Sequence, residues 1–305
     1  MRILVTGGAG FIGSHIVEHF QGKAEVRVLD NLRSGYLKNI APFKVEFIEG
    51  SVLDKDVLAK AMDGVDYVFH LAAMISVPES MGKPVECVEI NTIGTLNVLE
   101  AAARAGVRKM TLSTSAAIYG DNPVVPKRED MFPEPKSPYA ETKLSGEYYC
   151  GIYTKEGRLD TACLRYFNVF GPRQDPKSQY AAAIPIFISK ALRNEPITIF
   201  GDGEQTRDFI YVKDIAAANA FFATESPETG VFNVAYGGRI SINDLAKKII
   251  AILGSKSEII YKPERPGDVK HSTAAIDKLK KAGFTPSSNF DKGLEATVDF
   301  FKSQL

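Results

Sequence analysis

A tyrosine and a lysine four positions apart, Tyr139 and Lys143, have the residue types and the spacing of an acid–base pair. In a helix, positions i and i+4 lie on one face, so the two side chains would be neighbours. A phenol with a reference pKa of about 10 is only about one part in a thousand ionised at neutral pH, and a nearby ammonium group favours the phenolate. The pair can therefore take a proton from a hydroxyl group, although the same spacing also occurs on exposed helical faces.

Hydroxyl side chains run from Ser113 to Ser115, at the expected carboxyl end of a strand over 109–113. Ligands of open parallel sheets bind at the carboxyl ends of the strands. Ser115 is therefore the candidate to share a substrate oxygen with Tyr139. The alternative is a hydroxyl-rich turn that only caps the strand.

Three glycines, Gly7, Gly10 and Gly13, form a G-x-x-G-x-x-G run between an expected strand over 3–6 and an expected helix over 11–20. Glycine permits a tight turn and lets a pyrophosphate approach the backbone, while the start of a helix presents N–H groups and a partial positive charge. This placement favours a dinucleotide site over a glycine-rich turn without a ligand.

An acid, Asp30, ends the next expected strand, seventeen positions after Gly13. A carboxylate at this point accepts hydrogen bonds from the adenine-side ribose and repels a 2′-phosphate, which favours NAD over NADP. The alternative role is a cap on the turn together with Asn31. The nearby Arg33 leaves the choice of cofactor open.

A parallel sheet is needed to bring these residues together, and short β-rich runs alternate with helical patterns through the first half of the chain. The expected strands cover 3–6, 25–30, 45–49, 67–71, 109–113 and 161–168. The expected helices cover 11–20, 54–62, 88–105 and 139–154, and a proline-rich surface loop covers 123–138. The pattern predicts an α/β fold with a Rossmann-type, doubly wound parallel sheet.

The alternation of strand and helix patterns changes beyond Pro172, where glycine, proline and arginine separate shorter elements. We expect an NAD-binding Rossmann domain over 1–171 and a smaller C-terminal α/β substrate-binding domain over 172–305. The apolar runs between 209 and 236 are too continuous for a segment at the solvent-exposed edge of a domain. Part of this segment is therefore expected to return to the first domain.

Charge and composition exclude several classes of partner. Lysine plus arginine and aspartate plus glutamate number 37 each, so no global positive field attracts nucleic acid or an anionic membrane. The three cysteines lack metal-ligand spacing, and no metal site is expected. No apolar stretch approaches the roughly 20 residues that span a bilayer, and no targeting segment is recognised, so a cytoplasmic location is expected.

Taken together, the motifs resemble those of the UDP-glucose 4-epimerase family within the extended short-chain dehydrogenases. The resemblance runs nearly end to end, in family order. It rests on TGGAGFIGSH at 6–15, HLAA at 70–73, STSAAIYG at 113–120, SPYAETK at 137–143, RYFNVFGPR at 165–173 and GDGEQTRDFIYVKD at 201–214.

The resemblance implies a UDP-sugar 4-epimerase with tightly held NAD and a transient 4-keto sugar. Tyr139 would remove the 4-hydroxyl proton, Ser115 would share its hydrogen bond, and Lys143 would also hold the nicotinamide ribose. The implied cofactor contacts further include Phe11, Ile12, Asn31, Ser34, Ser51, Val52, Leu71, Ala72, Ala73, Asn91 and Tyr166. Many relatives carry an aspartate at position 51, so the resemblance leaves the adenine contact there open. The family usually forms homodimers through the helices over 88–105 and 139–154.

Substrate contacts are implied in the second half of the chain. Asn168 and Arg207 match positions that contact the diphosphate, and Arg265 and Asp268 match a phosphate and a ribose contact. Two arginines suit a diphosphate because a guanidinium fork binds its oxygens in pairs, although each alone could be a surface ion-pair residue. Ser272 stands where some relatives place a bulky tyrosine, so N-acetylated sugars are expected to fit as well.

The nearest alternative activity is that of a nucleotide-sugar dehydratase or decarboxylase, which shares the first oxidation. Such relatives place an acid directly after the hydroxyl position, whereas Ala116 and Ala117 follow here and offer no second acid or base. An alternative of another class is a non-catalytic NAD-binding protein, which would have no need of Tyr139, Lys143 and Ser115 together. A simple alcohol dehydrogenase would leave the second-half arginines unexplained.

Overall fold

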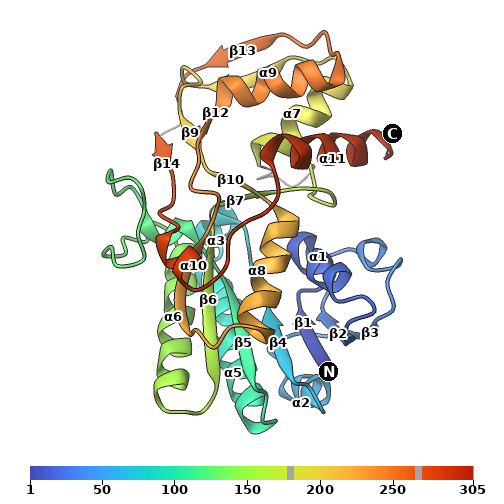
Figure 1. Ribbon diagram of the computed structural model, residues 1–305, viewed down its shortest axis with the longest axis vertical. Helices are drawn as coiled ribbons and strands as arrows, with labels where there is room; N and C mark the ends of the chain where they lie inside the picture. Colours follow the sequence, from blue (N-terminus) through green and yellow to red (C-terminus); the bar gives the residue numbers. More distant parts are fainter. Residues whose placement is uncertain (177–181, 265–269, 305) are drawn as a thin grey trace.

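The computed structural model describes residues 1–176, 182–264 and 270–304, and a seven-stranded parallel sheet forms its centre (Figure 1). In spatial order its strands are β11 (Gly230–Val234), β6 (Asp160–Tyr166), β5 (Lys109–Ser115), β4 (Tyr67–His70), β1 (Arg2–Thr6), β2 (Glu25–Asp30) and β3 (Glu46–Glu49). From β1 the chain adds β2 and β3 on one side, and then adds β4, β5 and β6 on the other side. This reversal confirms the predicted doubly wound Rossmann-type sheet.

Different helices cover the two faces of this sheet. One face carries α2 (Lys55–Met62), α5 (Gly94–Arg104) and α6 (Pro138–Lys155), and the other carries α1 (Phe11–His19) and α8 (Val212–Thr224). Successive side chains of a strand point to opposite faces. In β1, Leu4 is buried among the first group of helices, and Ile3 and Val5 are buried among the second. A continuous apolar strand is therefore required at this central position.

Helix α6 begins where its sequence predicts. Ser137 is its N-cap, and its hydroxyl accepts a hydrogen bond from the backbone N–H of Ala140 over 3.2 Å. Pro138 occupies the first turn, where the missing N–H costs nothing. This start fixes Tyr139 in the first turn of a long helix.

The second half of the chain builds a smaller layer above the carboxyl ends of the large sheet (Figure 1). Its elements are α7 (Ala183–Leu192), β8 (Ile197–Phe200), β9 (Thr206–Arg207), β12 (Ile240–Ser241), α9 (Ile242–Leu253), β13 (Ile259–Lys262), β14 (His271–Ser272) and α11 (Phe290–Lys302). It has an apolar core of its own, in which Ile188, Leu245 and Val298 are fully buried. Helix α8 and strand β11 also come from this half, yet both pack with the large sheet. The expected limits of the two domains stay a prediction.

Two predicted elements are divided in the structure. The strand expected over 161–168 ends at Tyr166, and Asn168 starts a separate strand, β7 (Asn168–Phe170), which pairs with β10 (Phe209–Tyr211). The chain leaves the large sheet here because the backbone N–H of Asn168 bonds to the carbonyl oxygen of Asp208.

The helix expected over 88–105 is likewise not uniform. It consists of α4 (Pro84–Val88), a wider π-helical stretch over Glu89–Ile93, and α5. The short helix α3 (Val77–Gly82) precedes it, and α10 (Asp277–Lys281) lies near the other end of the chain. Single helical turns cover Leu37–Asn39 and Ala116–Tyr119.

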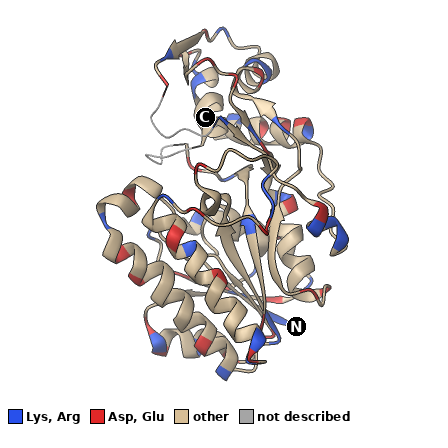
Figure 2. Ribbon diagram, turned by 90° about the vertical axis from the view of Figure 1, so that its left-hand side faces the viewer, with Lys and Arg blue, Asp and Glu red and all other residues tan. Residues whose placement is uncertain are grey.

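Charged residues of both signs are interspersed over the molecule (Figure 2). This distribution agrees with the formal net charge of zero. Among the described residues, no helix is long and apolar enough to cross a membrane.

Candidate active site

The glycine-rich turn lines a cleft at the carboxyl ends of β1 and β2. Gly7 has a φ of +72°, and a Cβ there would lie 2.7 Å from the amide nitrogen of Ala72. A Cβ on Gly13 would lie 2.2 Å from the carbonyl oxygen of Gly7. Gly10 is the N-cap residue of α1, and among the described residues no side chain forms a capping hydrogen bond there. The N–H groups of the first helical turn are therefore available to an anion.

Asp30 lines the same cleft at the end of β2. Its Oδ2 accepts a hydrogen bond from the N–H of Ala9 over 3.0 Å, and its Oδ1 accepts one from Leu32 over 2.8 Å. Burial raises the pKa of Asp30, and these two bonds oppose the rise. Asp30 thus does cap the turn, which was the alternative role, and its contact with a ribose stays a prediction.

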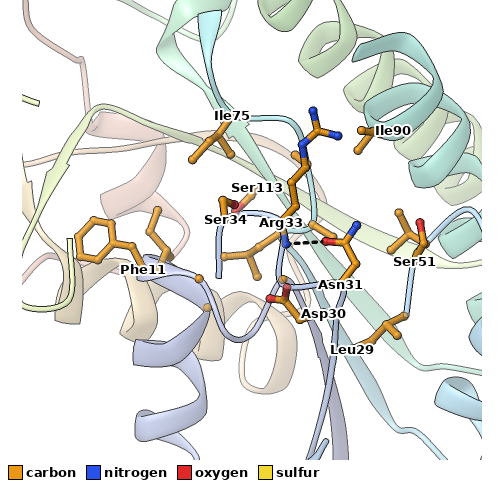
Figure 3. A pocket seen from close by; sticks show the side chains of 18 of the residues that line it. Phe11, Leu29, Asp30, Asn31, Arg33, Ser34, Ser51, Ile75, Ile90 and Ser113 are labelled. Atoms are coloured by element: carbon orange, nitrogen blue, oxygen red, sulfur yellow. Dashed lines mark hydrogen bonds between the residues drawn. The ribbon is translucent and has the colours of Figure 1, made fainter. Parts of the chain in front are cut away.

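Predicted cofactor residues from distant parts of the chain meet in this cleft (Figure 3). Those that line it are Gly7, Gly10, Phe11, Ile12, Gly13, Asp30, Asn31, Ser34, Ser51, Val52, Leu71, Ala72, Ala73, Tyr139, Lys143 and Tyr166. The glycine cradle, the open helix start and the apolar wall suit a pyrophosphate between two ring systems. The residues present therefore fit NAD.

A chain of hydrogen bonds holds the backbone at Ala72, which lies against the glycine-rich turn. Thr6 Oγ1 accepts from the N–H of Ala72 over 3.3 Å and lies 2.7 Å from His70 Nδ1. On the other side of the ring, His70 Nε2 lies 3.0 Å from Thr95 Oγ1, which donates to the carbonyl oxygen of Asn91 over 2.6 Å. Burial lowers the pKa of His70 to about 3, so the ring is neutral. Thr6 then donates to Nδ1, and the proton sits on Nε2.

Ser115, Tyr139 and Lys143 come together at one end of the cleft. Lys143 Nζ lies 5.8 Å from the ring centroid of Tyr139 and donates to the carbonyl oxygen of Ser113 over 2.9 Å. Burial lowers the pKa of Lys143 to about 8. Burial raises the pKa of Tyr139, and a hydrogen bond with Ser115 opposes that rise. The Ser115 hydroxyl also accepts from the N–H of Ala117 over 3.2 Å, so this residue caps the strand end as well.

The side-chain amide of Asn91 is engaged within the protein, and its expected contact with the cofactor stays a prediction. Its side chain is buried, and its Oδ1 accepts from the N–H of Met74 over 2.7 Å. Its Nδ2 donates to the carbonyl oxygen of Met74 over 3.1 Å and to Thr142 Oγ1 over 3.0 Å. Because the amide is engaged by its own surroundings, Asn91 supports the cleft and the start of α6 instead of lining the cleft.

Three predicted substrate residues meet where the second half of the chain faces the sheet. Ser272 pairs in register with Arg207 across β14 and β9. The N–H of Asp208 donates to the carbonyl oxygen of Ser272 over 2.9 Å. The side-chain Nδ2 of Asn168 donates to the backbone carbonyl oxygen of Asp208 over 3.2 Å. Arg207 Nη1 donates to the carbonyl oxygen of Thr206 over 3.0 Å. The other two predicted substrate residues, Arg265 and Asp268, lie outside the described residues.

Comparison with known protein families decides where this chain belongs. Residues 3–235 match the model of the NAD dependent epimerase/dehydratase family, which is more than half of the chain. The chain belongs to this family.

Solved epimerase structures resemble this family member over its whole length. The UDP-N-acetylglucosamine 4-epimerase of Methanobrevibacter ruminantium M1 is 44% identical, with a TM-score of 0.96 over 100% of this chain and 99% of that one. The UDP-glucose 4-epimerase of Thermotoga maritima is 40% identical, with a TM-score of 0.94 and the same coverage. The UDP-glucose 4-epimerase of Thermus thermophilus, solved with NAD, is 37% identical, with a TM-score of 0.90 over 100% of both chains.

Sequence reasoning missed several residues that line the cleft of this epimerase/dehydratase family member. Tyr36 lines it and donates from its hydroxyl to Asp175 over 2.9 Å. Arg173 also lines it and forms an ion pair with Glu18 of α1. Tyr36 and Arg173 stand in loops without regular spacing. No periodic pattern in the sequence indicates that these two residues line the cleft.

Asp208 is a second feature that sequence reasoning missed. Its Oδ1 accepts from the N–H of Tyr236 over 3.1 Å, and its Oδ2 accepts from Gly237 over 3.0 Å and from Ala274 over 3.1 Å. Burial raises the pKa of Asp208 to about 6, against the lowering effect of these bonds. Asp208 thereby holds the loops around the substrate residues. The sequence contains one indication of this role, because a charged residue stands directly before the apolar run Phe209 to Val212.

A buried ion pair joins β6 to the helix that carries Tyr139 and Lys143. Arg165 of β6 donates to both carboxylate oxygens of Glu147 on α6, over 2.9 and 2.7 Å, and its Nη1 donates to the hydroxyl of Tyr119 over 2.9 Å. Tyr119 donates in turn to Asn233 of β11 over 2.7 Å. Glu147 stands one turn after Lys143, so this network anchors the helix that carries the predicted acid–base pair.

Proposed function

We propose that the protein is an NAD-dependent 4-epimerase of UDP-sugars. It interconverts UDP-glucose and UDP-galactose, and the corresponding N-acetylhexosamine pair, through a transient 4-keto sugar. The observation that carries the proposal is the meeting of Ser115, Tyr139 and Lys143 beside a cleft that fits a dinucleotide. Full-length relatives named as 4-epimerases of both sugar classes support it.

Tyr139 is the general base and acid in this proposal. Bound NAD supplies a reversible oxidation at the sugar C4, so the reaction leaves no net oxidation. The phenolate of Tyr139 takes the proton of the C4 hydroxyl, and the same phenol later returns it. The Ser115 hydroxyl holds the same oxygen, since it already lies within hydrogen-bonding reach of Tyr139.

Lys143 stabilises the phenolate electrostatically. With a pKa of about 8, its ammonium group is mostly charged at pH 7. Its Nζ is held by the carbonyl oxygen of Ser113, so the charge stays close to the ring of Tyr139 without forming an ion pair with an acid. A positive charge in a buried setting lowers the pKa of a neighbouring phenol.

The diphosphate is proposed to bind at the cluster of Asn168 and Arg207, with further contacts from Arg265 and Asp268. Asn168 follows Tyr166 of the cofactor cleft by two positions, which supports a substrate next to the nicotinamide end. Ser272 has a small side chain and is paired in register with Arg207, which supports a site that also accepts an N-acetyl group.

The dehydratase or decarboxylase alternative is disfavoured by the residues beside the catalytic serine. Ala116 and Ala117 form the turn that follows Ser115. An elimination needs a second acid or base next to the sugar, and these methyl groups supply none. We therefore favour epimerisation within a family whose description covers both reactions.

We further propose a cytoplasmic homodimer whose partner is a small UDP-sugar and neither nucleic acid nor a membrane. Apolar side chains are exposed at helical spacing along α3, α4 and the π-helical stretch, and on the neighbouring α6. They are Met81, Val85, Val88 and Ile93, followed by Tyr148 and Ile152. Light scattering of the wild type and of a Val85→Glu/Ile152→Glu variant tests this interface. A monomeric wild type contradicts it.

The activity is tested by incubating the purified protein, without added cofactor, with UDP-galactose and separately with UDP-N-acetylgalactosamine. Product sugars are identified by NMR. Conversion to the gluco epimers supports the proposal and shows that the protein carries its own NAD. If neither sugar changes after NAD is added, the proposed activity is wrong.

A further inference from the structure

The loop after β2 carries a cation whose position matters for cofactor choice. Enzymes that use NADP hold its 2′-phosphate with an arginine near this point. Arg33 lines the cleft here, three positions after Asp30. In Figure 3 its side chain runs away from Asp30 and extends toward Ile75 and Ile90 on the other side of the cleft.

Two carboxylates on that other side hold the guanidinium group. Arg33 Nη2 donates to Glu79 Oε1 over 2.8 Å, and Nη1 donates to Glu86 Oε1 over 2.5 Å. Glu79 belongs to α3 and Glu86 to α4. The side chains of all three are about one third exposed, so the pairs are partly shielded from water. Each terminal nitrogen of the arginine fork thereby donates one of its two N–H groups to a carboxylate.

We propose that Glu79 and Glu86 are cofactor-specificity residues, which keep Arg33 away from a 2′-phosphate and so make the cleft selective for NAD over NADP. This inference rests on the proposed NAD-dependent function. The two glutamates act on the cofactor through Arg33 and take no part in the sugar chemistry.

The local charge balance supports this role. Asp30, Glu79 and Glu86 bring three carboxylates, and Arg33 and Lys83 bring two cations. A 2′-phosphate would therefore enter a region of net negative charge. If Arg33 turned toward the phosphate, only Lys83, at 3.7 and 3.5 Å, would remain to balance the two glutamates. NAD brings no such phosphate and leaves the ion pairs intact.

The test compares four proteins: wild type, Arg33→Ala, Glu79→Gln/Glu86→Gln and the triple variant. Each is equilibrated with equal excess concentrations of NAD and NADP, freed of unbound nucleotide by gel filtration and denatured. The released nucleotides are then quantified by chromatography. A Glu195→Gln/Asp291→Asn variant makes the same change in net charge at ion pairs of the second half of the chain and serves as the matched control.

We expect the double glutamine variant to raise the bound NADP-to-NAD ratio by about tenfold or more, as a new charged hydrogen bond to a phosphate would. Arg33→Ala alone should not raise the ratio, because it removes a cation, and the triple variant should lose the gain. An unchanged ratio in the double variant overturns the proposal, and so does a gain that persists in the triple variant or appears in the charge control. A wild type that retains neither nucleotide would instead contradict the proposed NAD-dependent function.

Discussion

Thr142 Oγ1 accepts a hydrogen bond from Asn91 Nδ2 over 3.0 Å and donates one to the backbone carbonyl oxygen of Tyr139 over 2.9 Å. The side-chain amide of Asn91 thereby fixes the first turn of α6, where Tyr139, the proposed general base, lies. The backbone N–H of Tyr139 is held as well, by Ser80 Oγ of α3 over 3.2 Å. The backbone of Tyr139 is thus held at both its N–H and its carbonyl oxygen.

Replacing Thr142 by valine keeps the shape of the side chain and removes this link. We expect kcat to fall about tenfold with little change in KM, because a small displacement of a catalytic group weakens catalysis more than binding. Stability should fall by about 1–3 kcal/mol, since Asn91 loses a buried partner. Thr297→Val is the matched control, because Thr297 is also buried and donates to a helical carbonyl oxygen, that of Gly293. An equal loss of kcat in both variants would contradict the positioning role.

Removing the phenolic hydroxyl in Tyr139→Phe should lower kcat by about 10²- to 10⁴-fold, the usual contribution of a positioned acid–base group. The NAD content of the purified protein should stay close to that of the wild type. Tyr148→Phe, on the exposed side of the same helix, should retain full activity. Rates from the NMR assay and nucleotide chromatography measure the two effects. A fully active Tyr139→Phe enzyme would exclude this residue as the base.

Arg165→Met should destabilise the fold by about 3–5 kcal/mol, because it leaves the Glu147 carboxylate buried without its partner. Adding Glu147→Leu should recover part of the loss, since the uncompensated charge is then gone. Arg193→Met breaks an exposed pair with Glu195 and should change stability by less than about 1 kcal/mol. Urea unfolding of the four proteins tests this. No recovery in the double variant would show that the hydrogen bonds, and not the buried charge, dominate.

Asp208 predicts a pH dependence of stability. Its folded-state pKa of about 6 lies above the usual value of 3.8, so the folded protein binds the proton more tightly than the unfolded chain. Its contribution is therefore fully present below about pH 4 and is lost as the pH rises through 6. Relative to Asp208→Asn, the wild type should lose about 1 kcal/mol between pH 5 and pH 7. Unfolding free energies of both proteins at the two pH values measure this difference. A constant difference would show that Asp208 titrates normally.

Ser272→Tyr should narrow the sugar pocket. We expect kcat/KM for UDP-N-acetylgalactosamine to fall at least about tenfold more than kcat/KM for UDP-galactose, because only the N-acetyl group needs the space. Ser272→Ala, which keeps the residue small, should leave the ratio of the two values unchanged. Parallel kinetics on both substrates provide the measurement. An equal loss on both sugars would place Ser272 away from the C2 substituent.

The order of elements and most of the cleft could be predicted from sequence, because periodicity and glycine spacing act over short stretches. The glycine-rich turn and Asp30 come from consecutive crossover units, and the parallel sheet brings their ends together. Tyr139 and Lys143 are linked by helical spacing alone. In each case a local pattern carries the information.

The rest depends on contacts between segments that have no common period. The network at Asn91 could not be predicted, because an asparagine in a helix pattern does not reveal that Met74 and Thr142 will occupy its amide. The break after Tyr166 was hidden for a similar reason: Phe167 and Asn168 continue an apolar β-like run, and only the partner strand β10 shows where the chain changes sheets.

The edge strand β11 has a consequence for the synthesis of this enzyme. It pairs with β6 from Gly230↔Ala162 to Val234↔Tyr166, and α8, which covers one face of the sheet, precedes it in the chain. Before α8 and β11 have been synthesised, the growing sheet has an open β6 edge, and only α1 covers part of the face on which α8 packs. Such surfaces pair readily with other chains. The nascent chain can complete the large sheet only after residue 234 has emerged, so the first half of the chain finishes folding only when part of the second half has been made.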